Sequence, residues 1–161
     1  MKKVVLFLVS GFILGIAVTG IITWKTMPGL MLKVVESRYD FEETLSRLQQ
    51  QIYSNNWEVR HIYEIGEDLY NMGYEGMFLR VNVISFCQPE YTYSILQDHH
   101  NRKISAIMPC RIAIFEDNEG NVFLSRMNIG LFSKMFSGDI GKILKLVAAD
   151  DEKILKDLSK E

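Results

Sequence analysis

The strongest constraint in this sequence is an uncharged stretch at residues 4–24, where only Ser10 and Thr19 interrupt the apolar run up to residue 22. At about 1.5 Å of helical rise per residue the stretch reaches about 31 Å, which matches the roughly 30 Å hydrocarbon layer of a bilayer. A cleaved secretory signal has a shorter apolar region that ends in small residues, and the nearest such pattern, at residues 17–20, lies inside the run. We therefore expect an uncleaved, single-pass transmembrane helix at residues 4–24.

The charges beside this anchor predict its orientation. Lys2 and Lys3 favour a cytoplasmic stub at residues 1–3, because positive charge is enriched on the cytoplasmic side of membrane helices. Lys25 and Lys33 follow closely on the other side, so the asymmetry is small. We expect the remainder of the chain to lie outside the cytoplasm.

Proline and glycine divide the anchor from the rest of the chain. The tripeptide Met27-Pro28-Gly29 is expected to end the helix, because proline lacks the amide proton for a helical hydrogen bond and its ring crowds the preceding turn. This places a linker at residues 25–31 and a folded domain at residues 32–161. A domain of about 130 residues suits a single hydrophobic core.

Composition and motifs exclude several classes of function. The net charge is −2 and the basic residues form no cluster in the sequence, so nucleic acid is not an expected partner. The sequence has no glycine-rich phosphate loop, and no serine or cysteine has a recognisable histidine and aspartate partner. Hydrolase and kinase activities therefore have no support, and whether the protein is an enzyme stays open.

Periodicity predicts an alternation of strands and helices. A strand at residues 32–39 leads to Asp40, a helix cap whose reciprocal partner would be Glu43, and apolar residues then recur at helical spacing. From residue 57 the period becomes two. The resulting strand, residues 57–65, is expected to place His61 on the same face as its apolar neighbours.

The second half of the domain continues this pattern. An alternating strand at residues 79–87 ends at Cys87, Pro89 opens a short helix, and Cys110 begins a hairpin at residues 110–127. A terminal helix follows, with an apolar stripe that one aspartate interrupts: Ile140, Ile143, Leu144, Val147, Asp151, Ile154, Leu155 and Leu158. The domain is thus expected to contain both strands and helices along its whole length.

Four segments carry a resemblance to a known family. They are VESRYDFEETL at residues 35–45, FCQP at residues 86–89, MPCRIAIFE at residues 108–116 and SRMN at residues 125–128. In these motifs the chain resembles the bacterial family called domain of unknown function 302, over about residues 32–155. The resemblance implies an α+β domain in which helices pack on one face of a curved antiparallel sheet, commonly in a homodimer, and the order of elements predicted above agrees with it. The resemblance brings no catalytic residues with it.

The resemblance also bears on the location of the protein and on its cysteines. A bacterial source together with the anchor implies the inner membrane, with the folded domain in the periplasm. Many members carry a small residue in place of Cys87 and lack a cysteine at the position of Cys110. The chain therefore resembles a membrane-anchored, cysteine-bearing branch of the family.

The side chains best suited to hold a cofactor are His61, Cys87 and Cys110, because imidazole and thiolate are ligands of haem iron and of several metals. Structural roles stay open for each: a hydrogen-bonded core histidine, buried thiols, or a disulfide if the two Cα atoms lie within about 7 Å. His99 and His100 are neighbours on an expected helix, where adjacent side chains diverge by about 100°. We expect at most one of these two histidines to bind a metal.

Three hypotheses for function follow. The first is a homodimeric accessory protein that binds a small ligand or cofactor, such as haem or a metal, through some of His61, Cys87 and Cys110, with a redox or sulfur-linked role. The second is a scaffold that holds partner proteins near the membrane and has purely structural cysteines. The third is a thiol-redox protein in which the two sulfurs interconvert between thiol and disulfide.

Overall fold

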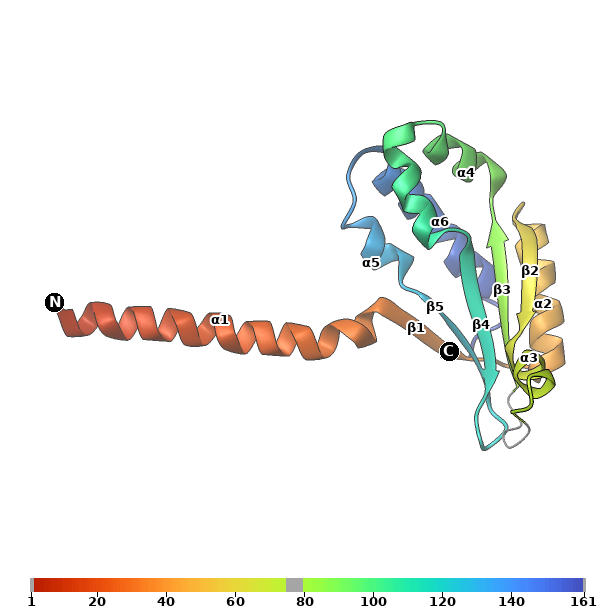
Figure 1. Cartoon of the computed structure of the whole chain (residues 1–161), viewed down its shortest axis with the longest axis horizontal. Helices are drawn as coiled ribbons and strands as arrows, with labels where there is room; N and C mark the ends of the chain where they lie inside the picture. Colours follow the sequence, from red (N-terminus) through yellow and green to blue (C-terminus); the bar gives the residue numbers. More distant parts are fainter. Residues whose placement is uncertain (1, 75–79, 161) are drawn as a thin grey trace. The chain divides into compact units, whose positions relative to one another are not determined.

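The computed structural model describes residues 2–74 and 80–160, and for residues 2–10 it describes the backbone alone. The chain divides into two compact units, Met1–Leu32 and Lys33–Glu161 (Figure 1). The first unit holds the predicted anchor, and the second holds the folded domain.

The first unit is helix α1 (Lys2–Met31). Within the described residues, the segment Gly11–Met31 is one helix that is long and apolar enough to cross a membrane, judged by length and composition. The predicted break at residues 27–29 is wrong, because α1 continues through Pro28 to its end. Pro28 cannot donate to the carbonyl four residues earlier, but it stands in the last helical turn, so a single hydrogen bond is lost and the helix need not stop there.

The second unit is an α+β domain whose described residues form a five-stranded sheet with the order β1-β5-β4-β3-β2. Neighbouring strands pair antiparallel from β2 through β5. The strand bounds are β1 (Leu32–Glu36), β2 (Glu58–Glu64), β3 (Val81–Cys87), β4 (Cys110–Glu116) and β5 (Val122–Met127). Leu79, which was predicted to begin the third strand, lies outside the described residues.

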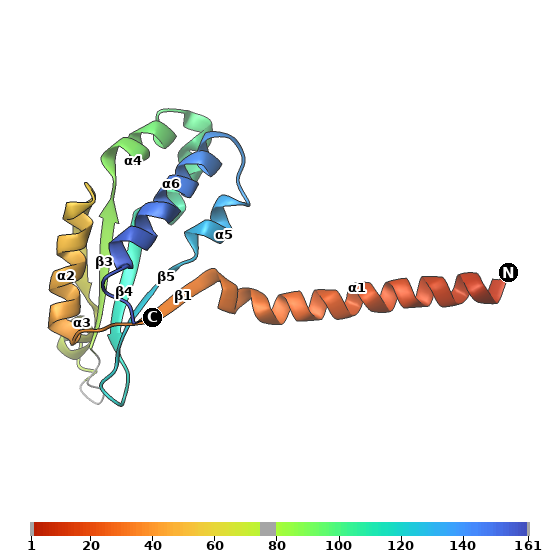
Figure 2. The same cartoon turned by 180° about the vertical axis from the view of Figure 1, so that it is seen from behind.

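Two long helices, α2 (Phe41–Ser54) and α6 (Gly138–Leu155), lie on one face of the sheet (Figure 2). We call this the covered face and the opposite one the open face. This arrangement confirms the predicted fold class. The shorter helices are α3 (Ile65–Asn71), α4 (Pro89–Leu96), the 3-10 helix η1 (His99–Ile107) and α5 (Ile129–Ser133).

Local sequence accounts for the start of α2. Asp40 caps the helix as predicted, because its Oδ1 atom accepts a hydrogen bond from the Glu43 amide at 2.9 Å. The Glu43 carboxylate does not complete the expected reciprocal bond and instead pairs with Arg47 at 2.8 Å. A side chain at one position thus decides where the helix begins.

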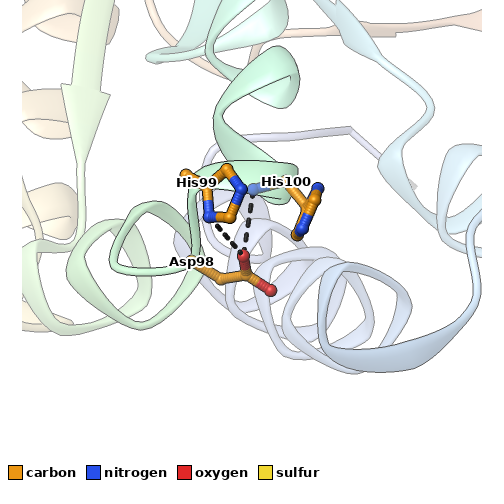
Figure 3. A group of neighbouring side chains, drawn as sticks. All are labelled: Asp98, His99 and His100. Carbon is orange, nitrogen blue, oxygen red and sulfur yellow. Dashed lines mark hydrogen bonds and ion pairs between the residues drawn. The ribbon is translucent and has the colours of Figure 1, made fainter.

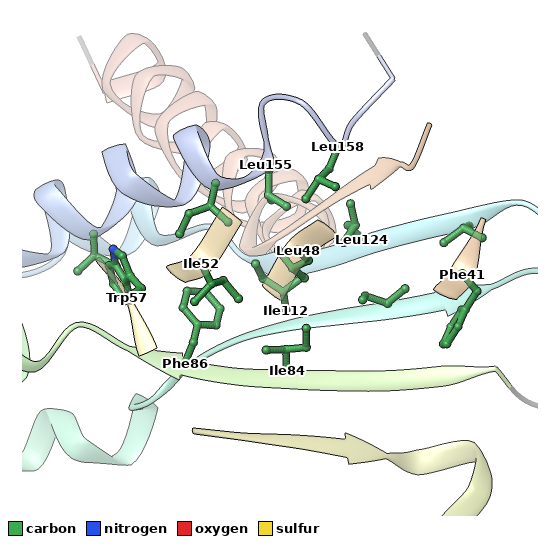
Figure 4. Close-up of a cluster of buried hydrophobic side chains, with 14 residues drawn as sticks. Phe41, Leu48, Ile52, Trp57, Ile84, Phe86, Ile112, Leu124, Leu155 and Leu158 are labelled. Carbon is green, nitrogen blue, oxygen red and sulfur yellow. The ribbon is translucent and has the colours of Figure 1, made fainter. Parts of the chain in front are cut away.

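The core lies between the covered face and the two long helices (Figure 4). On β3, β4 and β5 the core residues alternate, so Ile84, Ile112 and Leu124 are each fully buried. The core consists of Phe41, Leu48, Ile52, Trp57, Ile84, Phe86, Ile112, Ile114, Val122, Leu124, Val147, Ile154, Leu155 and Leu158. In these three strands, therefore, the even-numbered side chains point into the core.

A β-bulge in β2 reverses the predicted side-chain phase. Val59 lies opposite Phe86, and His61 lies opposite Ser85, so Arg60 is an extra residue that has no partner in the register. Because side chains alternate with a period of two, one added residue moves every later side chain to the other face. His61 is consequently exposed, whereas Ile62 packs against the core, and the prediction that His61 faces the apolar side is wrong.

Candidate functional site

The register places the two cysteines on opposite faces of the sheet. Cys110 lies opposite Phe86, and directly paired residues point to the same side, so Cys110 is on the covered face. Cys87 follows Phe86 and therefore points to the open face, opposite Glu58. Both cysteines are free. Side chains that point apart cannot form a disulfide unless the backbone moves.

His61 shares the open face with Cys87. It lies opposite Ser85 in the ladder between β2 and β3, and its ring packs edge-on against Tyr63 with the centroids 4.5 Å apart. The three predicted ligands therefore do not converge on one cavity, since His61 and Cys87 are on one side of the sheet and Cys110 is on the other.

Cys87 lines an open groove of about 630 Å³ between β2 and α4. A volume of this order suits a small organic molecule. The lining residues are Glu58, Arg60, Cys87, Pro89, Thr92, Tyr93, Leu96 and Gln97. The groove combines a thiol, a charge pair and a hydroxyl-bearing helix face.

Hydrogen bonds hold α4 in place as a wall of this groove. The helix begins where the Gln88 side chain accepts a bond from the Tyr91 amide at 2.8 Å, with Pro89 in the first turn. Its other side is tied to α6, because the Tyr91 hydroxyl donates to Asp150 at 3.1 Å. The Trp57 indole donates to the same carboxylate oxygen at 3.4 Å. The groove therefore stands on an ordered framework.

Burial favours the protonated form of the Cys87 thiol. Burial raises the pKa of Cys87 above its ordinary value, Arg60 acts to lower it, and Glu58 acts to raise it. Arg60 and Glu58 form an exposed ion pair, with Arg60 Nη1 and Glu58 Oε2 3.1 Å apart. An uncharged thiol can contact a bound molecule, but it is not an activated nucleophile.

The Cys110 thiol is expected to be less reactive than the Cys87 thiol. Burial raises the pKa of Cys110 to about 12, and the nearby negative charge of Asp151 contributes to the increase. The side chain packs against the main core. Cys110 therefore behaves as a small, partly buried apolar residue at the edge of the core.

The sequence did not predict a charge network beneath α6, in which Arg126 and Asp151 are buried and Glu152 and Lys33 are exposed. The Arg126 Nε atom lies 2.6 Å from Asp151 Oδ2, and Arg126 Nη2 lies 2.8 Å from Glu152 Oε1, which also pairs with Lys33 at 2.6 Å. Arg126 and Asp151 are both buried. Burial raises the pKa of Asp151 to about 6 against the opposing effect of Arg126. The network joins β5, α6 and β1.

His99 and His100 lie closer together than predicted. Their ring centroids are 3.8 Å apart, at the first two positions of η1 (Figure 3). The expectation of divergence assumed a regular helix interior. At a helix start no preceding turn restricts the rotamers, so adjacent rings can turn toward each other.

These features define an α+β domain with a groove on the open side of its sheet and a charge network on the covered side. Comparison with known families identifies it further. The family model described as "Domain of unknown function DUF302" matches residues 33–159, so the chain belongs to that family and the resemblance seen in the sequence is confirmed.

A solved structure supports the fold. The chain is similar to the crystal structure of an uncharacterized conserved DUF302 protein from Bacillus stearothermophilus, with a TM-score of 0.68 and 16% sequence identity. The alignment covers 79% of this chain and 97% of that one. No curated protein matches the chain. At this identity the likeness bears on the fold alone.

Proposed function

We propose that this protein is a membrane-anchored binding protein of the bacterial envelope, which holds a small ligand in the groove beside Cys87. Helix α1 anchors it in the inner membrane and the domain faces the periplasm. The observation that carries the proposal is the groove itself, a site of about 630 Å³ in which a protonated thiol lies next to an exposed Arg60–Glu58 pair.

The lining indicates the chemistry of the ligand. Arg60 has a side chain that is 58% exposed, so its guanidinium can exchange Glu58 for an anionic group of a bound molecule. Leu96 and Tyr93 offer apolar and aromatic surface to the remainder of that molecule. The expected ligand is therefore a small, largely apolar compound that carries a carboxylate or a similar anion.

Haem is the first compound to test in this groove. Its ring is apolar, its propionates are anions, and its iron accepts a cysteine ligand. Iron binding would displace the thiol proton of Cys87, since a metal ligand must be deprotonated. A bare metal ion suits the groove less well, because such ions take three or four protein ligands, and among the described lining residues the thiol and carboxylate ligands are those of Cys87 and Glu58.

The test is a titration of the full-length protein in detergent with haemin, followed by absorption, together with native mass spectrometry of protein extracted from membranes. We expect Cys87→Ala and Arg60→Gln to weaken binding by at least about tenfold each. Cys110→Ala is the matched control, because that thiol is on the covered face, and it should bind as the wild type does. No haemin binding and no co-purified compound would overturn the proposal.

A second role rests on the open face of the sheet. Phe115 and Phe123 stack there with ring centroids 5.4 Å apart, and Val83 is on the same face. This apolar surface suits a second copy of the chain, in line with the homodimer expected for the family, or a protein partner in the scaffold hypothesis. Phe123→Lys should convert a dimer into a monomer in sedimentation velocity, and Lys145→Glu on the exposed side of α6 should not.

The thiol-redox hypothesis receives less support. Exchange between Cys87 and Cys110 would require a bond through the sheet, and both thiols have raised pKa values. Redox cysteines instead have a lowered pKa and access to a partner sulfur.

A further inference from the structure

Two of the three histidines in this chain share one corner of the domain with a carboxylate. One potential ligand atom each from Asp98, His99 and His100 lies within 4.8 Å of the other two (Figure 3). Asp98 Oδ1 accepts a hydrogen bond from the His100 amide at 2.9 Å and lies 3.7 Å from His99 Nδ1. All three side chains are exposed, so the space between them is open to solvent.

We propose that Asp98, His99 and His100 form a binding site for one divalent transition-metal ion of the zinc type. Two imidazoles and one carboxylate are the donor set that zinc, nickel and copper prefer, whereas calcium and magnesium take oxygen ligands. Three protein ligands leave at least one coordination position for water or for a further ligand. The proposal extends beyond the groove ligand and does not depend on it.

The geometry of the cluster favours coordination. Zinc binds nitrogen and oxygen at about 2.0–2.2 Å, which places tetrahedral donor atoms about 3.3 Å apart. The 3.7 Å between Asp98 Oδ1 and His99 Nδ1 is close to this separation, and a ring nitrogen of His100 lies within 4.8 Å of a ligand atom on each of the other two residues. The hydrogen bond from the His100 amide orients the carboxylate, as partners outside the coordination sphere do at metal sites.

The site is distinct from the groove beside Cys87. None of its three residues lines that groove, although Gln97, which does, directly precedes Asp98. The remaining histidine, His61, belongs to the open face of the sheet. Metal binding can therefore be measured separately from ligand binding, with His61 as an internal control.

The experiment uses the full-length protein in detergent, with any polyhistidine tag removed and with prior treatment by a chelator. Calorimetric titration with Zn²⁺ should give one ion per chain, and Co²⁺ should produce visible absorption bands that Zn²⁺ then abolishes. His99→Gln and His100→Gln should each weaken Zn²⁺ binding by at least about tenfold. His61→Gln should leave the affinity unchanged.

Circular dichroism of each variant verifies that these surface substitutions leave the fold intact. Zinc affinity that persists in the His99→Gln, His100→Gln double variant would overturn the proposal. The same holds for a loss of affinity in His61→Gln, or for one ion shared by two chains. Haemin binding by the same double variant should remain at the wild-type level, so failure of the metal site is distinguishable from failure of the proposed groove function.

Discussion

Cys110 and Cys87 stand on neighbouring strands at the same end of the sheet, but on opposite faces. Cys110 faces α6 and the core, where burial raises its pKa to about 12. Cys87 faces the groove, beside an exposed ion pair. Both residues terminate a strand, so the difference arises only from which side of the sheet the helices cover.

Charged residues repeat the contrast between the faces. On the covered face Arg126 and Asp151 form a buried pair that bridges a strand and a helix. On the open side Arg60 and Glu58 pair in solvent. The comparison teaches that contact with α2 and α6, rather than residue type, determines whether a polar group in this domain is structural or available to a ligand.

The largest expected difference between the faces is in thiol reactivity. At pH 8, iodoacetamide should modify Cys87 at least about 100-fold faster than Cys110, because the thiolate is the nucleophile and the pKa of Cys110, raised to about 12, leaves far less thiolate there. Two single variants separate the rates: Cys110→Ala leaves Cys87 as the thiol that is measured, and Cys87→Ala leaves Cys110. Mass spectrometry of the labelled full-length protein measures both rates. Similar rates would contradict the assignment of the two faces.

Truncation of β3 side chains should have the next largest effect. Phe86→Ala, on the covered face, should lower the free energy of unfolding by about 3–5 kcal/mol, because it leaves a cavity in the core. Val83→Ala, on the open face of the same strand, should cost about 1 kcal/mol or less, since it removes little buried area. Urea unfolding followed by circular dichroism compares the two. Equal losses would mean that the open face is packed as tightly as the core.

Sequence alone predicted the features that short-range rules specify. The Asp40 cap and the strand that ends at Cys87 both depend on residues a few positions apart. The phase predicted for that strand was wrong, because the side that holds Val83 and Cys87 is the open face, and Ile84 and Phe86 enter the core instead. His61 was misplaced because Arg60 adds one residue to β2, and no local signal marks that bulge. The sequence also could not predict which face of the sheet the helices cover, because this depends on packing between segments that are distant in the chain.

The buried charge network was visible in part. Asp151 interrupts the apolar stripe of α6, and Arg126 occupies an inward position after Leu124. Each signal suggests a polar group in the core, yet neither names its partner. The packing of α6 against β5 brings Arg126 and Asp151 together. The sequence therefore showed two polar residues at inward positions, but it did not show that they form an ion pair.

The covered-face pair should make stability depend on pH. Burial raises the pKa of Asp151 from 3.8 to about 6, so between these pH values the folded state binds a proton that the unfolded state releases. The free energy of unfolding should therefore fall as pH rises through this window, by at most about 3 kcal/mol. Asp151→Asn should remove this component of the slope.

Urea unfolding at a series of pH values measures this component as the difference between wild type and variant. Asp139→Asn is the control, because that carboxylate is exposed on the same helix and pairs with Lys142. An Asp151→Asn variant with the wild-type pH dependence would show that Asp151 keeps an ordinary pKa, held down by Arg126.

The open-face pair should have the smallest effect on stability and a specific effect on chemistry. Glu58→Gln should change the free energy of unfolding by no more than about 1 kcal/mol, because exposed ion pairs contribute little. Glu58 raises the pKa of Cys87 and Arg60 lowers it, so Glu58→Gln should accelerate alkylation of Cys87 and Arg60→Gln should slow it. Alkylation rates measured at pH 8 in a Cys110→Ala background show whether each variant accelerates or slows the reaction of Cys87. If both variants shifted the alkylation rate in the same direction, steric access to the groove rather than charge would control the reactivity of Cys87. The thiols on both faces would then be limited by access.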